Sequence, residues 1–563
     1  MRPGQGNQLF VLLLSTILVA CGSDHSIPSA KVIDGLDLKK GGLIFCGPPE
    51  AEFGALDFET TCDPSIKKDF NIAVELLHSF EYDESEKVFA GIIGRAPGCA
   101  MAYWGVAMCN FHPLWEPPTK ADLKKGGEAV DIARSIAGKS ERESGFIDAV
   151  AAYYKDWDKD IPFRVRTAAF EKAMEQLYLQ YPADAEAAIF YALALDAAAS
   201  PTDGSYSKQR KAGDLLNALY KTAPNHPGII HYIIHTYDYP NIAELGLTAA
   251  RRYAQVAPSS AHALHMPSHI FTRLGLWDDC IRSNRASVAA AQCYAQLVGI
   301  RGHWDEELHG LDYLIYAHLQ RGDNKAAEEQ LRYLDSIREV YPVNFKVAYT
   351  FAAAPARVAL ENKDWAMAAS LTLHSGGLEW GRFPWQEAIN HFARLLGNVH
   401  LRKMEAAQSE LIRLGQLHDE LVKQNDTYKA GQVAIQMKAG EAWIKFGMGK
   451  RPEALSLMRL AADMEDSTSK HPVTPGEVLP ARELYADMLL ENKEYAVALQ
   501  AYEGVLQKCP NRWNSLYGAG QAAGMGGDVR KAFLYFRELP VMADTASKRP
   551  ELSVAKKFLE KHS

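Results

Sequence analysis

The chain has 563 residues and a net charge of −8, and 47% of its residues are hydrophobic. This length exceeds what one hydrophobic core usually covers, so the sequence predicts several domains or one elongated array of repeats. Both signs of charge are mixed throughout without a basic stripe, which excludes a typical nucleic-acid-binding protein.

The first 21 residues are predicted to be a processing signal. Arg2 is the only charge before an apolar run at residues 9–20, which is too short to span a bilayer as a helix. The run leads into LVACG at residues 18–22, which resembles the lipobox of bacterial lipoproteins. The alternative is an ordinary signal peptide, or a membrane anchor, with a chance cysteine.

The lipobox resemblance implies that Cys21 is acylated and becomes the first residue of a chain held at the bacterial cell envelope. Residue 22 is Gly rather than Asp, so the inner-membrane retention signal of enteric lipoproteins is missing. This favours the outer membrane over the inner one. No other segment is long and apolar enough to cross a membrane.

Export also permits disulfide bonds. Seven cysteines remain besides Cys21, so at least one must stay unpaired within a monomer. Cys46 and Cys62 flank a poorly periodic stretch that contains glycine and proline. They are the predicted disulfide pair, and free thiols are the alternative.

Five further segments are expected after residue 21. Residues 22–66 are predicted to be irregular because glycine and proline pairs break the pattern repeatedly. Residues 67–465 show amphipathic helices joined by short turns. Two prolines mark residues 466–478 as a linker or as a loop over the groove. A pair of C-terminal repeats is expected at 479–546, followed by a tail at 547–563.

The C-terminal residues show the clearest internal repeat. Ala498 and Tyr502 recur at one constant spacing as Ala532 and Phe536, and Pro510 ends the first unit. This spacing is the period of the tetratricopeptide repeat (TPR), a helix-turn-helix unit of about 34 residues. The chain therefore resembles TPR proteins. The resemblance implies an all-α fold, a right-handed TPR-like α-solenoid with a concave groove.

Two histidine pairs have the same period. His231 and His235 recur one repeat length later as His265 and His269. An i, i+4 pair lies on one face of a helix, and stacked repeats bring equivalent faces alongside one another. Four imidazoles are therefore expected to converge on one patch.

The TPR register adds two histidines to this patch. In TPR proteins, positions 2, 5 and 9 of the first helix face the groove, and the register puts His262 and His309 at position 2. Pro267 interrupts the second pair, because it either kinks the helix or begins it. In the latter case the sequence does not decide whether the two histidine pairs face each other.

The motifs HPGIIHYIIH at residues 226–235 and HALHMPSHI at residues 262–270 resemble a group of bacterial TPR proteins that carry both. That resemblance supports a paired feature and implies no activity. Asp238, Asp312 and Glu306 are candidate acceptors for the second N–H of a ligating imidazole. The alternative is that the histidines only line the groove and were copied with the repeat.

Two functions follow from these patterns. One is a cell-envelope binding or scaffold protein whose groove holds a peptide, a protein or a small molecule, with no role for nucleic acid and with the lipid anchor in the membrane. The other is a metal-dependent hydrolase or oxidoreductase, because imidazoles with an open position are typical of catalytic metal sites. The ion would be a transition metal such as Zn, Cu, Fe or Mn, bound by His231, His235, His265, His269, His262 and His309.

Overall fold

The computed structural model of the protein describes residues 27–48, 50, 52–114, 117–200, 203–468 and 471–562 together with Met1. The predicted lipidation site, Cys21, lies outside these residues. Among the described helices, none has the length and apolar character that crossing a membrane requires.

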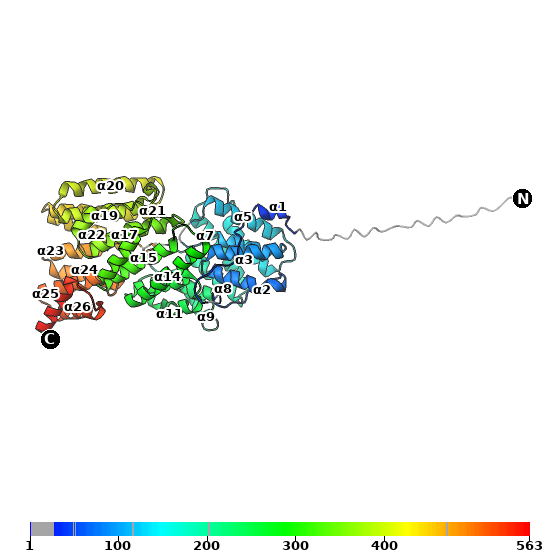
Figure 1. Cartoon of the computed structure of the whole chain (residues 1–563), viewed down its shortest axis with the longest axis horizontal. Coiled ribbons are helices and arrows are strands. Elements are labelled where there is room, and N and C mark those ends of the chain that lie inside the picture. Colours follow the sequence, from blue (N-terminus) through cyan, green and yellow to red (C-terminus); the bar gives the residue numbers. More distant parts are fainter. Residues whose placement is uncertain are drawn as a thin grey trace.

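The described residues form an all-α, TPR-like α-solenoid, as the sequence predicts, in which successive helices pack against one another along the molecule (Figure 1). The first helices are α1 (Ala30–Asp34), η1 (Pro64–Ile66), α2 (Lys67–His78), α3 (Tyr82–Arg95), α4 (Ala100–Cys109), α5 (Lys120–Ser135), α6 (Glu141–Tyr154), α7 (Phe163–Gln180), α8 (Ala185–Ala197) and α9 (Ser207–Tyr220). The central elements are α10 (Pro227–Tyr237), η2 (Ala243–Gly246), α11 (Leu247–Val256), α12 (Ala261–His265), α13 (Pro267–Arg273), α14 (Trp277–Val298), α15 (Asp305–Gln320), α16 (Asn324–Ser336), α17 (Phe345–Glu361) and α18 (Trp365–Ser370). The last are η3 (Trp380–Arg382), α19 (Pro384–His400), α20 (Met404–Lys423), α21 (Thr427–Gly447), α22 (Arg451–Asp466), α23 (Ala481–Glu491), α24 (Tyr495–Lys508), α25 (Trp513–Met525), α26 (Val529–Met542) and α27 (Pro550–His562). Two short strands, β1 (His303–Trp304) and β2 (Val340–Tyr341), pair in parallel.

The aromatic residues of the C-terminal repeats pack against glycines of a neighbouring helix. The ring of Tyr502 lies over Gly518, where an added Cβ would come within 2.3 Å of the ring. The ring of Phe536 lies over Gly520 in the same way, at 2.6 Å. Only a residue without a side chain lets the two helices approach this closely.

The C-terminal helices fold back onto the middle of the array. The guanidinium of Arg512, which is fully buried, contacts Glu361 of α17 at 2.8 Å and Tyr316 of α15 at 3.2 Å. The backbone N–H of Trp513 donates to Gln320 at 2.9 Å. Helices α22 and α23 pack directly on each other, so the described residues between them, 467–468 and 471–480, connect two helices of one continuous array.

The N-terminal segment crosses several repeats as an extended strap. Its backbone bonds to distant turns, with Ala55 N–H donating to Asn225 and Ser259 N–H donating to Glu52. Two disulfides attach it, Cys46–Cys293 to α14 and Cys62–Cys99 to the start of α4. The predicted Cys46–Cys62 pair is therefore wrong, because an extended segment brings its cysteines to different helices. Among the described cysteines, the free thiols are Cys109, Cys280 and Cys509.

We expect the double substitution Cys46→Ser/Cys293→Ser to lower the free energy of unfolding by about 2–4 kcal/mol, because it releases a very long closed loop in the unfolded chain. Urea unfolding monitored by circular dichroism measures the change, and Cys509→Ser is the matched control. Peptide mapping without reduction that recovered a Cys46–Cys62 bridge would contradict this arrangement.

Candidate metal centre

The first histidine pair lies on α10. His226 is the N-cap of this helix, and Pro227 occupies the first helical position, where no N–H partner is needed. His231 and His235 follow on one face, and their Nε2 atoms lie 3.0 Å apart. The HPG motif thus begins the helix so that the two imidazoles meet.

The second pair spans a junction between two short helices. Helix α12 ends at His265 and α13 begins at Pro267, with Met266 between them in the right-handed helical conformation. Pro267 therefore starts a helix, and Met266 continues the turn across the junction. The Nε2 atoms of His265 and His269 lie 3.1 Å apart, so the proline does not separate the pair.

Hydrogen bonds from Nδ1 determine where the ring protons lie. The Nδ1–H of His231 donates to the carbonyl of His78 at 2.6 Å, and the Nδ1–H of His265 donates to Oδ1 of Asn284 at 2.7 Å. The amide nitrogen of Asn284 donates to the carbonyl of Cys280 at 2.8 Å, which sets the orientation of this amide. Both acceptors are oxygens without a proton, so Nδ1 carries the hydrogen in each ring.

His269 is oriented by a carboxylate. Its Nδ1–H donates to Oδ2 of Asp238 at 2.9 Å, and Oδ1 of Asp238 accepts from Arg273 at 3.0 Å. Carboxylate-to-histidine bonds of this kind hold the ring of a metal ligand and direct Nε2 toward the metal. In neutral His265 and His269, both Nε2 atoms are therefore lone-pair acceptors.

Two nitrogen lone pairs that face each other at 3.1 Å repel unless a proton or a cation lies between them. Burial, followed by the neighbouring imidazoles, lowers the pKa of both His231 and His265 well below the ordinary histidine value, which disfavours the proton. With metal–nitrogen bonds of about 2.0–2.1 Å, two ligand nitrogens at roughly 90–110° are about 2.8–3.4 Å apart. The second pair fits this geometry.

Two further histidines complete the cluster. His262 joins the first pair and His309 joins the second, and in each triplet the ligand atoms lie within 4.8 Å of one another. Ring centroids of His265 and His309 are 4.2 Å apart, and those of His235 and His269, from different triplets, are 6.2 Å apart. The structure thus brings together all six predicted ligands: His231, His235, His262, His265, His269 and His309.

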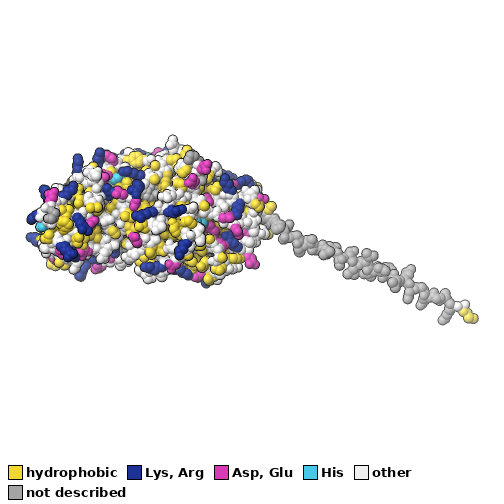
Figure 2. All heavy atoms as spheres, turned by 90° about the horizontal axis from the view of Figure 1, so that it is seen from below, with side chains coloured by type: hydrophobic (Ala, Val, Ile, Leu, Met, Phe, Trp, Pro, Cys, Tyr) yellow, Lys and Arg dark blue, Asp and Glu magenta, His cyan; other side chains and the backbone are white. Residues whose placement is uncertain are grey.

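The cluster is enclosed and does not line an open groove. His231, His265 and His269 are at most 2% exposed. The loop after α22 covers them, because Val473 accepts a bond from Tyr313 at 3.2 Å and Pro475 accepts one from Arg273 at 3.0 Å. Little histidine reaches the face shown in Figure 2. This differs from the expected histidine-lined concave groove, because five of the six imidazoles are buried and only His235 is half-buried.

The three acidic candidates have different roles. Asp238 orients His269, as described above. An oxygen of Glu306 lies 3.8 Å from Nδ1 of His262, too far for a direct hydrogen bond. Asp312 instead forms a buried ion pair with Arg357 and does not reach a histidine of the cluster in any described contact.

A third group was missed by the sequence reasoning. The carboxylate of Glu186 lies between Nε2 of His78 at 3.0 Å and Nε2 of His226 at 2.9 Å. Burial alone would raise the pKa of this carboxyl, but the two imidazoles lower it below the ordinary value. This group joins α2, α8 and α10, and it places the His78 carbonyl that orients His231. His78 is 153 residues from His231, so no local spacing could have indicated it.

Two cavities adjoin the cluster. A small one of about 20 Å³ lies among the histidines and is also lined by Met266 and Lys346. A cleft of about 190 Å³ has His235, Asp238 and Asp196 in its wall. His235 lines both, so the first triplet is the part of the cluster nearest to the cleft.

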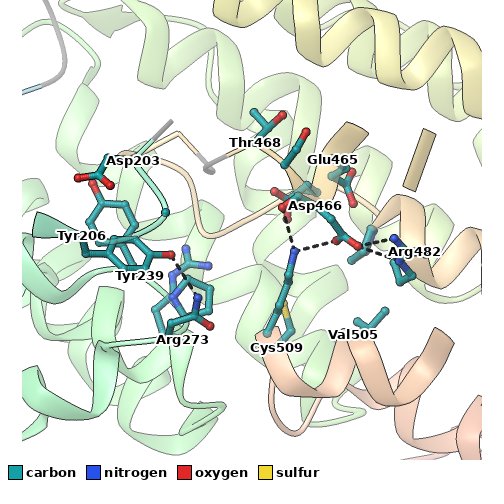
Figure 3. A pocket seen from close by; sticks show the side chains of 17 residues that line it. Asp203, Tyr206, Tyr239, Arg273, Glu465, Asp466, Thr468, Arg482, Val505 and Cys509 are labelled. Carbon is teal, nitrogen blue, oxygen red and sulfur yellow. Dashed lines mark hydrogen bonds and ion pairs between the residues drawn. The ribbon is translucent and has the colours of Figure 1, made fainter. Parts of the chain in front are cut away.

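A larger cavity of about 290 Å³ lies beyond Arg273 (Figure 3). Its charged groups largely pair with one another, since Asp466 contacts both Lys508 and Arg482 (Figure 3). Nothing in it matches the facing lone pairs of the histidine cluster. The smaller, histidine-lined cavity is therefore the candidate metal centre.

No protein-family model matches the chain, and the comparison with curated proteins found no match. Solved structures similar to it include yeast Tom70 at 11% identity and a TM-score of 0.28, covering 88% of this chain and 96% of that one. The TPR domain of P58(IPK) has 10% identity and a TM-score of 0.18, covering 89% and 99%. Naa15/Naa10 bound to HypK-THB has 12% identity and a TM-score of 0.21, covering 88% and 73%. Similarities this low carry no statement about function.

Because the Asp196 carboxyl is buried beside the cleft, we expect the free energy of unfolding to depend on pH. Burial raises its pKa to about 8, although Thr236 donates to it at 2.6 Å. The folded state therefore holds a proton that the unfolded chain releases near pH 4, and stability falls by on the order of 1 kcal/mol per pH unit between those values. Urea unfolding at pH 5 and pH 8 should show a smaller decrease in Asp196→Asn than in the wild type. Equal decreases would mean that this carboxyl is ionised throughout.

Proposed function

We propose that the protein holds two transition-metal ions, one in each histidine triplet, and uses them on a small molecule. The observation that carries the proposal is the 3.1 Å separation of the Nε2 atoms of His265 and His269, whose Nδ1 atoms bond to Asn284 and Asp238. Burial of the cluster supports a metalloenzyme over a peptide-binding groove, because only small molecules fit beside it.

The solenoid positions these ligands, and its outer surface is where a protein partner would bind, as extended repeat arrays do. We place the protein at the bacterial cell envelope with Cys21 as its lipid anchor, and the outer membrane is the favoured site. The disulfides Cys46–Cys293 and Cys62–Cys99 support an oxidising compartment. Intact-mass analysis of the wild type and of Cys21→Ser tests the anchor, since only the wild type should carry acyl chains.

Metal analysis tests the centre directly. We expect the full-length chain, purified without an affinity histidine tag and reconstituted with Zn, Cu, Fe or Mn in turn, to retain about two equivalents of at least one of these metals. His265→Ala/His269→Ala should retain about one equivalent, because the first triplet keeps its three ligands. His231→Ala/His235→Ala should give the same loss from the other triplet.

The matched control is His418→Ala on α20, which removes a partly exposed imidazole outside the cluster and should leave two equivalents. Circular dichroism establishes that each variant is folded. A folded wild-type chain that retains no metal after reconstitution would refute the proposal. If the wild type retains one equivalent of metal and either double variant retains none, the six histidines share a single ion and the two-ion centre is wrong.

A further inference from the structure

The cavity of about 290 Å³ beyond Arg273 is a second candidate site, separate from the histidine triplets (Figure 3). Most of the charges in its wall already have partners. Asp466 contacts both Lys508 and Arg482, and the carboxylate of Asp203 accepts bonds from two nearby serines. The charged groups that remain for a ligand are Arg273 and two glutamates.

Arg273 presents a nitrogen donor to this cavity. The residue is 5% exposed, its Nε–H donates to Asp238 at 3.0 Å, and its Nη2–H donates to the carbonyl of Pro475 at 3.0 Å. Among the described residues none accepts a bond from Nη1, and this nitrogen is not sealed within the protein. It therefore faces the cavity that Arg273 lines. A buried guanidinium with N–H donors left over is suited to bind a carboxylate.

Two carboxyl groups line the same cavity. The backbone N–H of Ala481 donates to Oε1 of Glu465 at 2.7 Å, and no described residue bonds to the carboxylate of Glu477. Burial, followed by the negative charge of Glu477, raises the pKa of the Glu465 carboxyl well above its ordinary value. The two groups are therefore close together, in a place where a cation would stabilise both.

The positive and negative groups lie on different sides of the cavity. Figure 3 shows Arg273 beside Tyr206 and Tyr239. Glu465 lies across the cavity from them (Figure 3). An anion alone would also face the glutamates, and a cation alone would also face the arginine. A small molecule with a carboxylate at one end and an ammonium at the other matches both sides.

The size and the rest of the lining narrow the class of ligand. The volume of about 290 Å³ lies just below the usual range of small-molecule pockets, which is roughly 300–1,000 Å³. The rings of Tyr206 and Tyr239, with centroids 5.1 Å apart, offer an apolar surface for part of the ligand. Because the other charges of the wall are paired, the rest of the ligand should be uncharged.

We infer that this cavity binds a free amino acid with an uncharged side chain, its carboxylate on Arg273 and its ammonium on Glu465 and Glu477. This inference does not depend on the metal centre. Arg273 also contacts Asp238, which orients His269. The carboxylate end of the ligand therefore adjoins the second histidine triplet.

The experiment offers glycine, L-alanine, L-leucine and L-phenylalanine singly to the full-length chain. We expect at least one of them to raise the melting temperature and to bind in isothermal titration calorimetry, because a ligand that binds only the folded state stabilises it. Its N-acetyl derivative lacks the ammonium and its amide lacks the carboxylate, so each should bind at least tenfold more weakly. If none of the four binds, or if the two analogues bind as tightly as the amino acid, the inference is wrong.

Two variants assign the contacts. Glu477→Gln keeps the size of the side chain and should weaken binding at least tenfold. It should also reduce the preference for the amino acid over its N-acetyl derivative, which a purely structural role would leave unchanged. Arg273→Lys keeps a positive charge beside Asp238 but removes Nη1, so the preference for the amino acid over its amide should shrink. The matched control is Glu379→Gln, at an exposed position outside the cavity, which should bind as the wild type does.

Circular dichroism establishes that each variant is folded. If Arg273→Lys fails to fold, the amide offered to the wild type still tests the carboxylate contact. Unchanged affinity in folded Glu477→Gln would contradict the place given to the ammonium. A wild-type chain that binds an amino acid but retains no metal would refute the metal centre and leave this inference in place.

Discussion

The structure depends on one constraint: several imidazoles are buried together with their Nδ1 protons already used. His231, His265 and His269 each donate Nδ1–H to an oxygen that cannot donate back. Their Nε2 atoms are thereby directed toward the neighbouring imidazoles, and all three side chains are buried. A cation is the simplest partner for such an arrangement, and the rest of the fold can be understood as the support that keeps these acceptors in place.

That support comes from parts of the chain that are far apart in sequence. The N-terminal helix α2 supplies the carbonyl of His78, and the Glu186 carboxylate fixes the His78 ring between α8 and α10. The loop after α22 closes the other side through Val473 and Pro475. Most of these contacts bridge more than one hundred residues, so the centre forms only when the solenoid has curled onto itself.

The same curling explains why the open groove of the TPR resemblance is absent around the histidines. Arg512 and Trp513 attach the C-terminal repeats to α15 and α17, and the disulfide-linked N-terminal strap runs across the other repeats. A repeat array that normally leaves a concave surface is here wrapped around a small, buried site. This shape suits chemistry on a small molecule better than capture of a peptide at this position.

The sequence by itself determined the repeat period, the all-α solenoid and the identity of the six histidines. These are local or periodic properties, since His231 and His235 share a helix face and their counterparts recur one repeat later. Only the tertiary structure decided the disulfide partners, the burial of the cluster and the groups that orient it. Cys46 pairs with Cys293, 247 residues away, and His78 meets His231, 153 residues away. Such contacts depend on how many helices stack and curl between the two residues. No short-range pattern in the chain encodes the combined effect of that stacking.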